Sequence, residues 1–397
     1  MLDRAASVRR VYAPDAFRCR LVTTLCTLFL FCFVLSSVHG QALAEEPSRT
    51  IPVGETEVAA DCTRLDAYTL GLSAEELLAV LPRLPKLREI NFVDENGLCA
   101  YTAETVSALD PIRAAYPDIH LRLSFSLFGQ TVSSESERIE FYRVPIGNEG
   151  MAQLCAVAPY LRACRYLLID GCGVDDAVMA QFREDFPELG VVWRIWFTQE
   201  YYSSRLMTLK GSVMSDAERV RIRTVNDSNC EKLGYCTETK YIDLGHNFYL
   251  SDFSFLAHMP KLEVCIIAIT SLHDLTPLAS CPELEYLEIF TTSVTDLSPL
   301  AKCTKLKHLN ISNLKKVTDL TCLYGLEFDR LRAVVTKIPK EQIEEYARLH
   351  PNCELLMQGG DPTENGWRYL PTGQQVPRYA LLREQMKYDE DRANGIP

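Results

Sequence analysis

The most constraining feature of this 397-residue chain is a short phrase that recurs four times in its second half. It begins at Asp252 as Asp-Phe-Ser-Phe-Leu and returns at intervals of 22, 22 and 23 residues, at Asp274, Asp296 and Asp319. Ahead of each phrase lies a short strand pattern with alternating apolar residues (Ile242/Leu244, Cys265/Ile267, Leu287/Ile289 and Leu309/Ile311). One unit of this size cannot bury its own apolar residues, so neighbouring units must stack.

The leucines between the units complete a known frame. Leu262, Leu284 and Leu306 each begin an L-x-x-L-x-L pattern, which is the frame of a leucine-rich repeat. We therefore predict an α/β fold in which residues 239–335 form a leucine-rich repeat solenoid with one parallel strand face. Leucine-rich repeats usually have an asparagine in the turn that follows each strand. Here it is present in the first unit and replaced in the next three, so irregular turns are expected along that edge of the sheet (Asn247, Thr270, Thr292 and Leu314).

The first half of the chain, residues 45–205, is predicted to contain two similar strand–helix–strand copies. Helices are predicted over 102–116 and 175–186, and each ends at an aromatic-Pro-acid step that a helix cannot continue through. Pro111 is expected to kink or split the first helix. After the second strand of each copy comes a pair of serines, Ser133-Ser134 in one copy and Ser203-Ser204 in the other.

Two further segments complete the predicted organisation. Residues 206–238 are predicted to connect the two halves, and residues 336–397 to form a C-terminal cap. The cap contains a predicted helix over 339–349 and a polar, proline-containing tail over 361–397. Because the last repeat of a solenoid leaves its core exposed, this tail is expected to cover that end.

The first 44 residues have the pattern of a targeting segment. Arginines precede an apolar run over 21–35, and Ala42-Leu43-Ala44 forms a small-x-small cleavage site. We predict a signal peptide cleaved after Ala44, with retention as a membrane anchor as the alternative. Cleavage removes five arginines and two aspartates, a sum of +3, so the net charge changes from -12 to -15. That acidity argues against a nucleic-acid partner, and no later stretch is apolar enough to predict a membrane span.

Several phrases resemble a known group of proteins. The Asp-Leu-Ser-Pro-Leu repeats resemble the internalin-type leucine-rich repeats of bacterial surface proteins. Other phrases resemble secreted leucine-rich repeat proteins of gut Firmicutes, over most of residues 65–390 (186–188, 191–194, 243–247, 361–368 and 378–383). The resemblance implies a bacterial protein that is secreted or located at the cell surface. It implies binding by analogy and carries over no functional residue.

The sequence contains none of the common catalytic or nucleotide-binding motifs. H-E-x-x-H, G-x-S-x-G, the phosphate loop and G-x-G-x-x-G are all absent. His246 is interpreted as a surface residue of a repeat turn, with a ligand or general base as the alternative. We therefore predict that the chain is not an enzyme, with no catalytic residue, metal site or cofactor. A hydrolase within residues 45–200 is the remaining enzymatic hypothesis, and the duplication of matching strands argues against it.

The fifteen cysteines permit two interpretations. Cys265, Cys281 and Cys303 occupy positions that hold leucine or methionine in other units, as small buried hydrophobic residues do. An exported chain can instead form disulfides, for which Cys281–Cys303 and Cys230–Cys236 are candidates.

The outward strand positions of the repeats are the candidate site. They bring aromatic and apolar side chains next to carboxylates on one concave face, a combination suited to a protein or glycan partner (Tyr241, Asp243, Ile266, Tyr286, Glu288, Phe290, His308 and Asn310). The alternative is that the C-terminal segment, or the loop over 198–229, folds across this face.

These observations together predict an extracellular, non-enzymatic binding or adhesion protein that uses this face at a cell surface. A structural component of the cell envelope is the alternative. The sequence leaves the identity of the partner and the oligomeric state open.

Overall fold

The computed structural model describes residues 49–201 and 207–394. The predicted signal peptide, residues 1–44, and its cleavage site lie outside the described residues. The chain divides into two compact units, residues 1–61 and 62–397. In the first unit, β1 (Thr50–Val53) and β2 (Thr56–Ala59) pair as an antiparallel hairpin. Within 49–201 and 207–394, no helix is long and apolar enough to cross a membrane.

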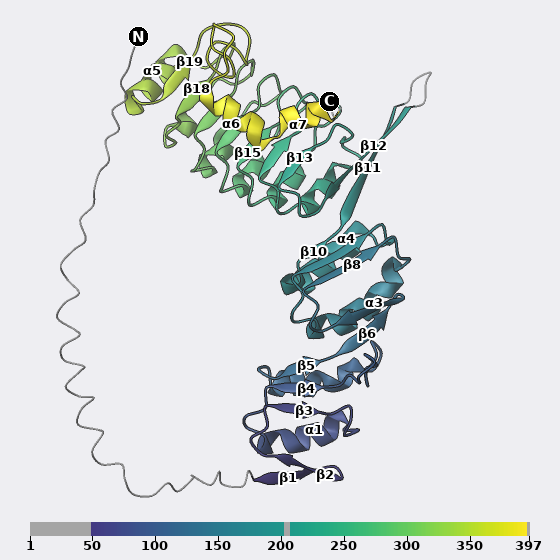
Figure 1. Cartoon of the computed structure of the whole chain (residues 1–397). Helices are drawn as coiled ribbons and strands as arrows, with labels where there is room; N and C mark the ends of the chain where they lie inside the picture. The colour runs from purple at the N-terminus through teal and green to yellow at the C-terminus, as the bar shows by residue number, and fades with distance from the viewer. Residues whose placement is uncertain (1–48, 202–206, 395–397) are drawn as a thin grey trace, which may run out of the picture. The chain divides into compact units, whose positions relative to one another are not determined.

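The second unit begins with two copies of one order of elements: strand, helix, strand, helix, strand and antiparallel hairpin (Figure 1). The first copy consists of β3 (Arg64–Asp66), α1 (Ala74–Val80), β4 (Glu89–Asn91), α2 (Asp110–Ala115), β5 (His120–Arg122), β6 (Ser124–Leu127) and β7 (Gln130–Ser133). The second consists of β8 (Arg138–Tyr142), α3 (Gly147–Val157), β9 (Tyr166–Asp170), α4 (Asp176–Asp185), β10 (Val191–Val192), β11 (Arg194–Tyr201) and β12 (Met207–Met214). In each copy the three strands before the hairpin form a parallel sheet.

Short 3₁₀ helices adjoin the helices of both copies: η1 (Leu81–Arg83), η2 (Val106–Leu109), η3 (Ala158–Tyr160) and η4 (Pro187–Leu189). The helix predicted over 102–116 is divided into η2 and α2. Pro111 lies in the first turn of α2, where its missing N–H leaves no helical hydrogen bond unmade. The predicted splitting at this proline is therefore what the structure has.

A buried serine closes the hairpin of each copy. Leu123 N–H donates to Ser134 Oγ at 3.0 Å, and Ser134 N–H donates to Leu123 O at 2.9 Å. In the second copy, Trp193 N–H donates to Ser215 Oγ at 3.1 Å, and Ser215 N–H donates to Trp193 O at 2.9 Å. The residue that bonds as Ser134 does is thus Ser215, because the second hairpin is longer than the first, and the predicted pair Ser203-Ser204 lies outside the described residues.

The rest of the second unit contains a seven-stranded parallel sheet in sequence order. Its strands are β13 (Arg219–Arg221), β14 (Tyr241–Asp243), β15 (Val264–Ile266), β16 (Tyr286–Glu288), β17 (His308–Asn310), β18 (Arg330–Arg332) and β19 (Glu354–Leu356). The return arms are η5 (Cys230–Tyr235), η6 (Ser254–His258), η7 (Thr276–Ser280), η8 (Ser298–Lys302), η9 (Thr321–Leu323) and α5 (Lys340–Leu349). The middle residue of each of the first six strands is buried (Val220, Ile242, Cys265, Leu287, Leu309 and Leu331). The segment predicted as a connection, 206–238, therefore supplies the first strand and the first return arm of this sheet.

The turns after the strands begin alike but differ in length, as the expectation of irregular turns requires. The segment before the next aspartate is one residue longer after β14 and β17 (244–251 and 311–318) than after β15 and β16 (267–273 and 289–295). Five non-glycine residues at the same position of successive turns nevertheless adopt positive φ angles between 56° and 66° (His246, Ile269, Thr291, Asn313 and Val335). The next residue usually ties the turn: Asn247 Nδ2 donates to Leu244 O at 2.9 Å, and Thr270 Oγ1 donates to Ile267 O at 2.8 Å. Leu314 cannot make this bond and is fully buried instead. A hydroxyl or an apolar side chain thus replaces the asparagine without changing the positive φ angle of the residue before it.

The cysteines of the repeats pack as buried thiols. The described residues include seven buried free cysteines (Cys164, Cys172, Cys230, Cys236, Cys265, Cys281 and Cys303). Cys281 Sγ donates to Leu256 O at 3.3 Å, and Cys303 Sγ donates to Leu278 O at 3.3 Å. Burial raises the pKa of Cys281 to about 12, which keeps this thiol protonated. Of the two interpretations, the structure has small buried side chains and not the disulfides Cys281–Cys303 or Cys230–Cys236.

Candidate functional site

The outward side chains of the seven-stranded sheet form two aligned columns. Tyr241, Val264, Tyr286, His308 and Arg330 are in register along one column, and Asp243, Ile266, Glu288, Asn310 and Arg332 along the other. Phe290 follows two residues after Glu288, beyond the end of β16. The structure therefore brings the predicted site residues together along one face of the sheet.

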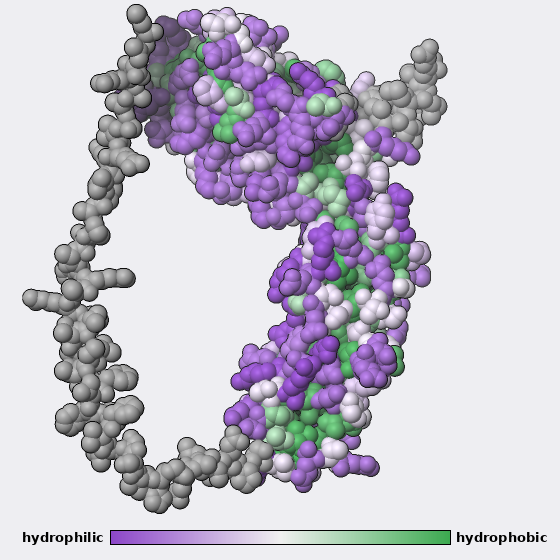
Figure 2. Space-filling model, viewed as in Figure 1, coloured by the Kyte–Doolittle hydropathy of each residue, from purple (hydrophilic) through white to green (hydrophobic). Residues whose placement is uncertain are grey.

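The C-terminal segment, residues 361–394, lies across this face (Figure 1). It contains α6 (Pro377–Gln385) and α7 (Tyr388–Ala393). Its apolar side chains and the outward residues of β15 and β16 form one buried cluster (Val264, Ile266, Tyr286, Trp367, Val376, Tyr379, Leu382 and Met386). The surface over α6 and α7 is mostly hydrophilic in Figure 2. This segment therefore acts as a cover, with its apolar side on the sheet and its polar side toward solvent.

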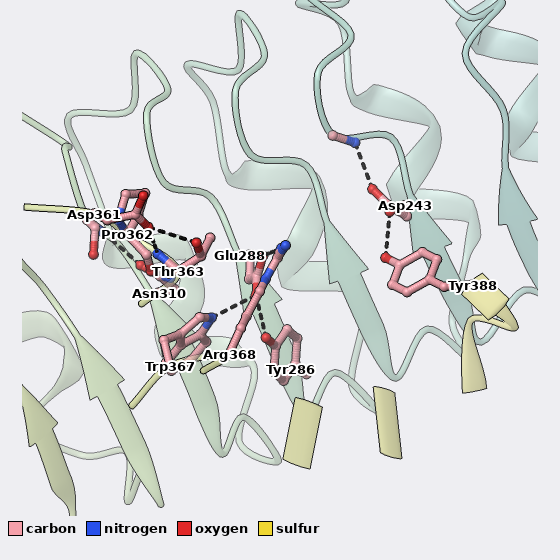
Figure 3. A network of polar contacts seen from close by, with 12 residues as sticks. Asp243, Tyr286, Glu288, Asn310, Asp361, Pro362, Thr363, Trp367, Arg368 and Tyr388 are labelled. Carbon is pink, nitrogen blue, oxygen red and sulfur yellow. Dashed lines mark hydrogen bonds and ion pairs between the residues drawn. The ribbon is translucent and has the colours of Figure 1, made fainter. Parts of the chain in front are cut away.

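The carboxylate of Glu288 is at the centre of the contact (Figure 3). Its Oε1 accepts hydrogen bonds from Trp367 Nε1 at 2.7 Å and from Arg368 Nε at 3.1 Å. Arg368 Nη2 pairs with Oε2, and the Tyr286 hydroxyl donates to Oε1. A carboxylate with no exposed area requires partners of this kind, because burial of an unpaired charge is very unfavourable.

These contacts fix the protonation of the groups around Glu288. Burial, together with the neighbouring carboxylate, raises the pKa of Tyr286 well above its ordinary value, so the phenol remains a donor. Burial lowers the pKa of Arg368, but Glu288 outweighs this effect and raises it well above the ordinary value. Burial, with Arg378, Arg330 and Lys307 adding to it, lowers the pKa of His308 to about 3, so this imidazole is neutral near pH 7.

Polar contacts at β17 and β18 hold the beginning of the C-terminal segment. Asn310 Nδ2 donates to Pro362 O at 2.8 Å (Figure 3), and Arg332 Nη2 donates to Asp361 O at 2.5 Å. The Asp361 carboxylate accepts from Thr363 N–H at 2.6 Å and so closes the turn of the segment. Strand residues thus recognise main-chain carbonyls of the cover.

The other end of the cover is held at β13 and β14. The Tyr388 hydroxyl donates to Asp243 Oδ2 at 2.6 Å. The buried carboxylate of Asp391 pairs with Arg219 at 2.7 Å and with Arg221 at 3.2 Å. The cover is therefore attached by polar groups along the sheet from β13 to β18.

The prediction that this face is open to solvent is wrong. Five of the predicted site residues are buried (Ile266, Tyr286, Glu288, Phe290 and Asn310), and three are half-buried (Tyr241, Asp243 and His308). The alternative in which the C-terminal segment folds over the face is what the structure has. The tail over 361–397 is polar on average, but the aromatic residues within it were a signal of packing that composition conceals (Trp367, Tyr369, Tyr379 and Tyr388).

The polar groups of the covered face hold the chain's own segment. Glu288 accepts hydrogen bonds from Trp367, Arg368 and Tyr286, and burial raises the pKa of Tyr286 so that its hydroxyl remains a donor. Throughout the described part of the chain, no group of three or more His, Cys, Asp or Glu side chains is placed to hold a metal ion. His246, which the sequence left open as a ligand or base, lies exposed in a turn.

A second sheet face, that of β8 and β9, exposes aromatic side chains. Ile139 and Phe141 of β8 are buried, so the alternate residues Arg138, Glu140 and Tyr142 point outward. Tyr142 is 56% exposed, and Trp196, in β11, is 54% exposed. Sequence reasoning missed this face because it extended the outward columns only through the 22-residue repeats. The alternation over 138–142 was the available signal.

Each aromatic ring of this second face has an arginine beside it. The guanidinium carbon of Arg138 lies 3.8 Å from the ring centroid of Tyr166, that of Arg143 lies 5.0 Å from Tyr142, and that of Arg194 lies 5.9 Å from Trp196. Arg194 Nε also pairs at 3.1 Å with Asp170, which is the outward residue at the end of β9. We call this surface the arginine–aromatic face (Arg138, Glu140, Tyr142, Arg143, Tyr166, Asp170, Arg194 and Trp196).

A pocket of about 290 Å³ adjoins the arginine–aromatic face. It is lined by the loop over 171–176 and by side chains that include Trp193, Arg194, Trp196 and Lys232. Asp176 accepts from Trp193 Nε1 at 3.0 Å and pairs with Lys232 Nζ at 3.5 Å. Hydrogen bonds and ion pairs thus fix the walls of this pocket.

No protein-family model and no curated protein matches the chain. Among solved structures, the chain is similar to internalin C2 of Listeria monocytogenes, with 23% identity, coverage of 33% of this chain and 69% of that chain, and a TM-score of 0.25. It is also similar to the internalin InlF of the same bacterium (15% identity, 76% and 88% covered, TM-score 0.32). A leucine-rich repeat protein of Leptospira interrogans gives 12% identity, 69% and 73% coverage and a TM-score of 0.33. Because these scores are low, the leucine-rich repeat architecture rests on the L-x-x-L-x-L frame and the parallel strand register of this chain.

Proposed function

We propose that this protein is an extracellular, non-enzymatic binding protein for a protein partner, and that the arginine–aromatic face is its binding surface. The extracellular location rests on the predicted signal peptide over 1–44. The parallel strands β8 and β9 present most of this face.

One observation carries the proposal: the chain covers one sheet face with its own segment but leaves aromatic side chains exposed on another. Tyr286 of the covered face is 1% exposed, whereas Tyr142 and Trp196 are 56% and 54% exposed. Tyrosine, tryptophan and arginine are the residue types that contribute most to binding at protein interfaces. Tyr286 and Phe290 would meet a partner only after the cover had left, so they are not part of the proposed surface.

The test is a capture experiment with the chain that begins at Glu45. Immobilised protein is incubated with surface proteins extracted from epithelial and bacterial cells, and bound proteins are quantified by mass spectrometry. The dissociation constant of the main partner is then measured for the pair Tyr142→Ala and Trp196→Ala. We expect affinity to fall at least about tenfold, since each anchor contributes roughly 1 kcal/mol or more.

The matched control replaces exposed apolar residues elsewhere, Leu98→Ala with Phe248→Ala, each 63% exposed in the native chain. This control should leave affinity unchanged. Equal affinities for the two double variants would place the binding surface elsewhere. Retention in the cell-wall fraction without any specific partner would favour the structural alternative.

A further inference from the structure

We propose that the arginine–aromatic face binds an acidic segment of its partner protein, one in which carboxylates alternate with apolar side chains. This inference rests on the proposed function and names the partner chemistry of the same surface. It follows from the pairing of charges on the face and from a carboxylate that the chain binds within itself.

The unpaired charge of this face is positive. Glu140 pairs with Arg138, and Asp170 pairs with Arg194, so both carboxylates of the face are already engaged. Arg143 has no carboxylate partner among the residues that the structure describes. The whole chain has a net charge of -12, so this positive group stands out against an acidic background. An acidic partner is attracted to this face and repelled by most of the remaining surface.

The backbone of Arg143 is held in place by its neighbours in the face. Its backbone N–H donates to Asp170 O at 2.8 Å, and its φ of 54° turns the chain directly after β8. Its guanidinium lies beside the exposed ring of Tyr142. A guanidinium held against a ring still presents its N–H edges, which match the two oxygens of a carboxylate.

One of the two ion pairs of the face, Arg138–Glu140, is accessible to exchange. The side chains of Arg138 and Glu140 are 59% and 46% exposed, and a pair of that exposure contributes little stability. A carboxylate of the partner can therefore replace Glu140 at small cost. The rings of Tyr142 and Trp196 are available at the same time for the apolar side chains of the segment.

The covered sheet shows the same recognition in intramolecular form. There the carboxylate of Glu288 is bound by Arg368, whose guanidinium carbon lies 5.3 Å from the ring centroid of Tyr379 and 5.9 Å from that of Phe290. Trp367 donates its indole N–H to the same carboxylate. There the acid is on the strand and the arginine is on the covering segment, but the chain already uses an arginine beside aromatic rings to hold a carboxylate.

The test uses fluorescence anisotropy with three probes: a labelled peptide of alternating Glu and Leu with two Tyr residues, the same peptide with Gln in place of Glu, and labelled heparin. We expect the acidic peptide alone to bind, with affinity falling as salt rises. The variant Arg138→Glu with Arg143→Glu should weaken it at least tenfold. The control Arg83→Glu with Arg348→Glu reverses two exposed charges elsewhere and should bind as the native chain does. Circular dichroism melts establish that each variant is folded.

Equal binding of the acidic and Gln peptides, or no effect of Arg138→Glu with Arg143→Glu, would overturn the acidic-segment proposal. Binding of heparin without the acidic peptide would do the same and would point to an acidic glycan. The two proposals fail in different ways. If Tyr142→Ala with Trp196→Ala abolishes capture of the partner but charge reversal and salt have no effect, the proposed binding surface is supported and the proposed acidic partner is rejected. If neither set of changes affects capture, both proposals are rejected.

Discussion

At the scale of single residues, the pairing of Glu288 determines which sheet face of the chain is closed. A carboxylate with 0% exposure is tolerated because Trp367, Arg368 and Tyr286 all donate to it. Two of these donors come from the C-terminal segment, more than 75 residues away along the chain. Glu288 therefore couples the sheet to the cover, since a change that removes Arg368 but keeps the cover in place would leave a buried carboxylate without its cationic partner.

This dependence predicts a strong coupling between two substitutions. Arg368→Met should destabilise the chain by about 3–5 kcal/mol, because it leaves the Glu288 carboxylate buried and unpaired. Glu288→Leu combined with Arg368→Met should cost much less than the two single changes together, since no buried charge remains. Urea unfolding measures all three free energies. Arg348→Met, which breaks an exposed pair with Glu345, is the control and should cost less than about 1 kcal/mol. Additive costs in the cycle would show that Arg368 and Glu288 are not coupled.

At the scale of elements, the recurrent aspartates begin the return arms. Asp274 Oδ1 accepts from Thr276 N–H at 2.8 Å and from Thr276 Oγ1 at 2.6 Å. Ser298 donates its backbone N–H and its hydroxyl to the Asp296 carboxylate, and Thr321 donates the same two groups to the Asp319 carboxylate. These hydrogen bonds fix the start of each 3₁₀ helix, which explains why an acidic residue and a hydroxyl residue recur together.

The same bonds predict a pH-dependent contribution to stability. The hydrogen bonds from Thr276 lower the pKa of Asp274 below its unfolded value of 3.8. Its stabilisation is thus complete above that value and is lost as pH falls through the folded pKa. Asp274→Ala should cost about 1 kcal/mol at pH 7, as loss of a capping side chain does. Asp274→Asn keeps the acceptor oxygen and should cost less.

Urea unfolding at pH 7 and pH 3 checks this prediction. The difference in unfolding free energy between the native chain and Asp274→Asn should shrink at pH 3, where the native aspartate begins to take up a proton. A difference that stays constant or grows on acidification would mean that the charge of Asp274 is not what stabilises the turn.

The repeats also show how far sequence alone reaches at this scale. Strands with two apolar alternates, such as Leu287/Ile289, are predictable because their period is set by the core. β13 was missed because Arg219-Val220-Arg221 offers one apolar residue, and its inward position is evident only from its register with Ile242. Thr270 replaces Asn247 in the next unit without loss of the side-chain hydrogen bond in the turn, since a hydroxyl can donate to the same main-chain carbonyl position.

At the scale of the whole second unit, the covered face is a second core outside the repeats. Repeat periodicity predicts which side chains point outward, but it contains no information about a non-repeating segment that later packs on them. The predicted site residues therefore do share one face of the sheet, but that face is covered and not open to solvent. The arginine–aromatic face was not predicted, because its strands belong to the two copies in the first half of the chain. The period of these copies is longer and less regular than that of the 22-residue repeats.

If residues 361–394 are a structural cover, removing them must expose this second core. A chain ending at Leu356 should bind a hydrophobic dye and lose at least about 5 kcal/mol of unfolding free energy, because Val264, Ile266 and Tyr286 lose all their apolar neighbours in the cover. Trp367→Ala, a milder change, should cost about 3–5 kcal/mol and leave the circular dichroism spectrum unchanged. A chain ending at Asn394 is the control and should match the native protein. If the chain ending at Leu356 melted at the native temperature without binding dye, the segment would be a loosely held flap. The sheet face of Tyr286 and Phe290 would then return as a candidate binding surface.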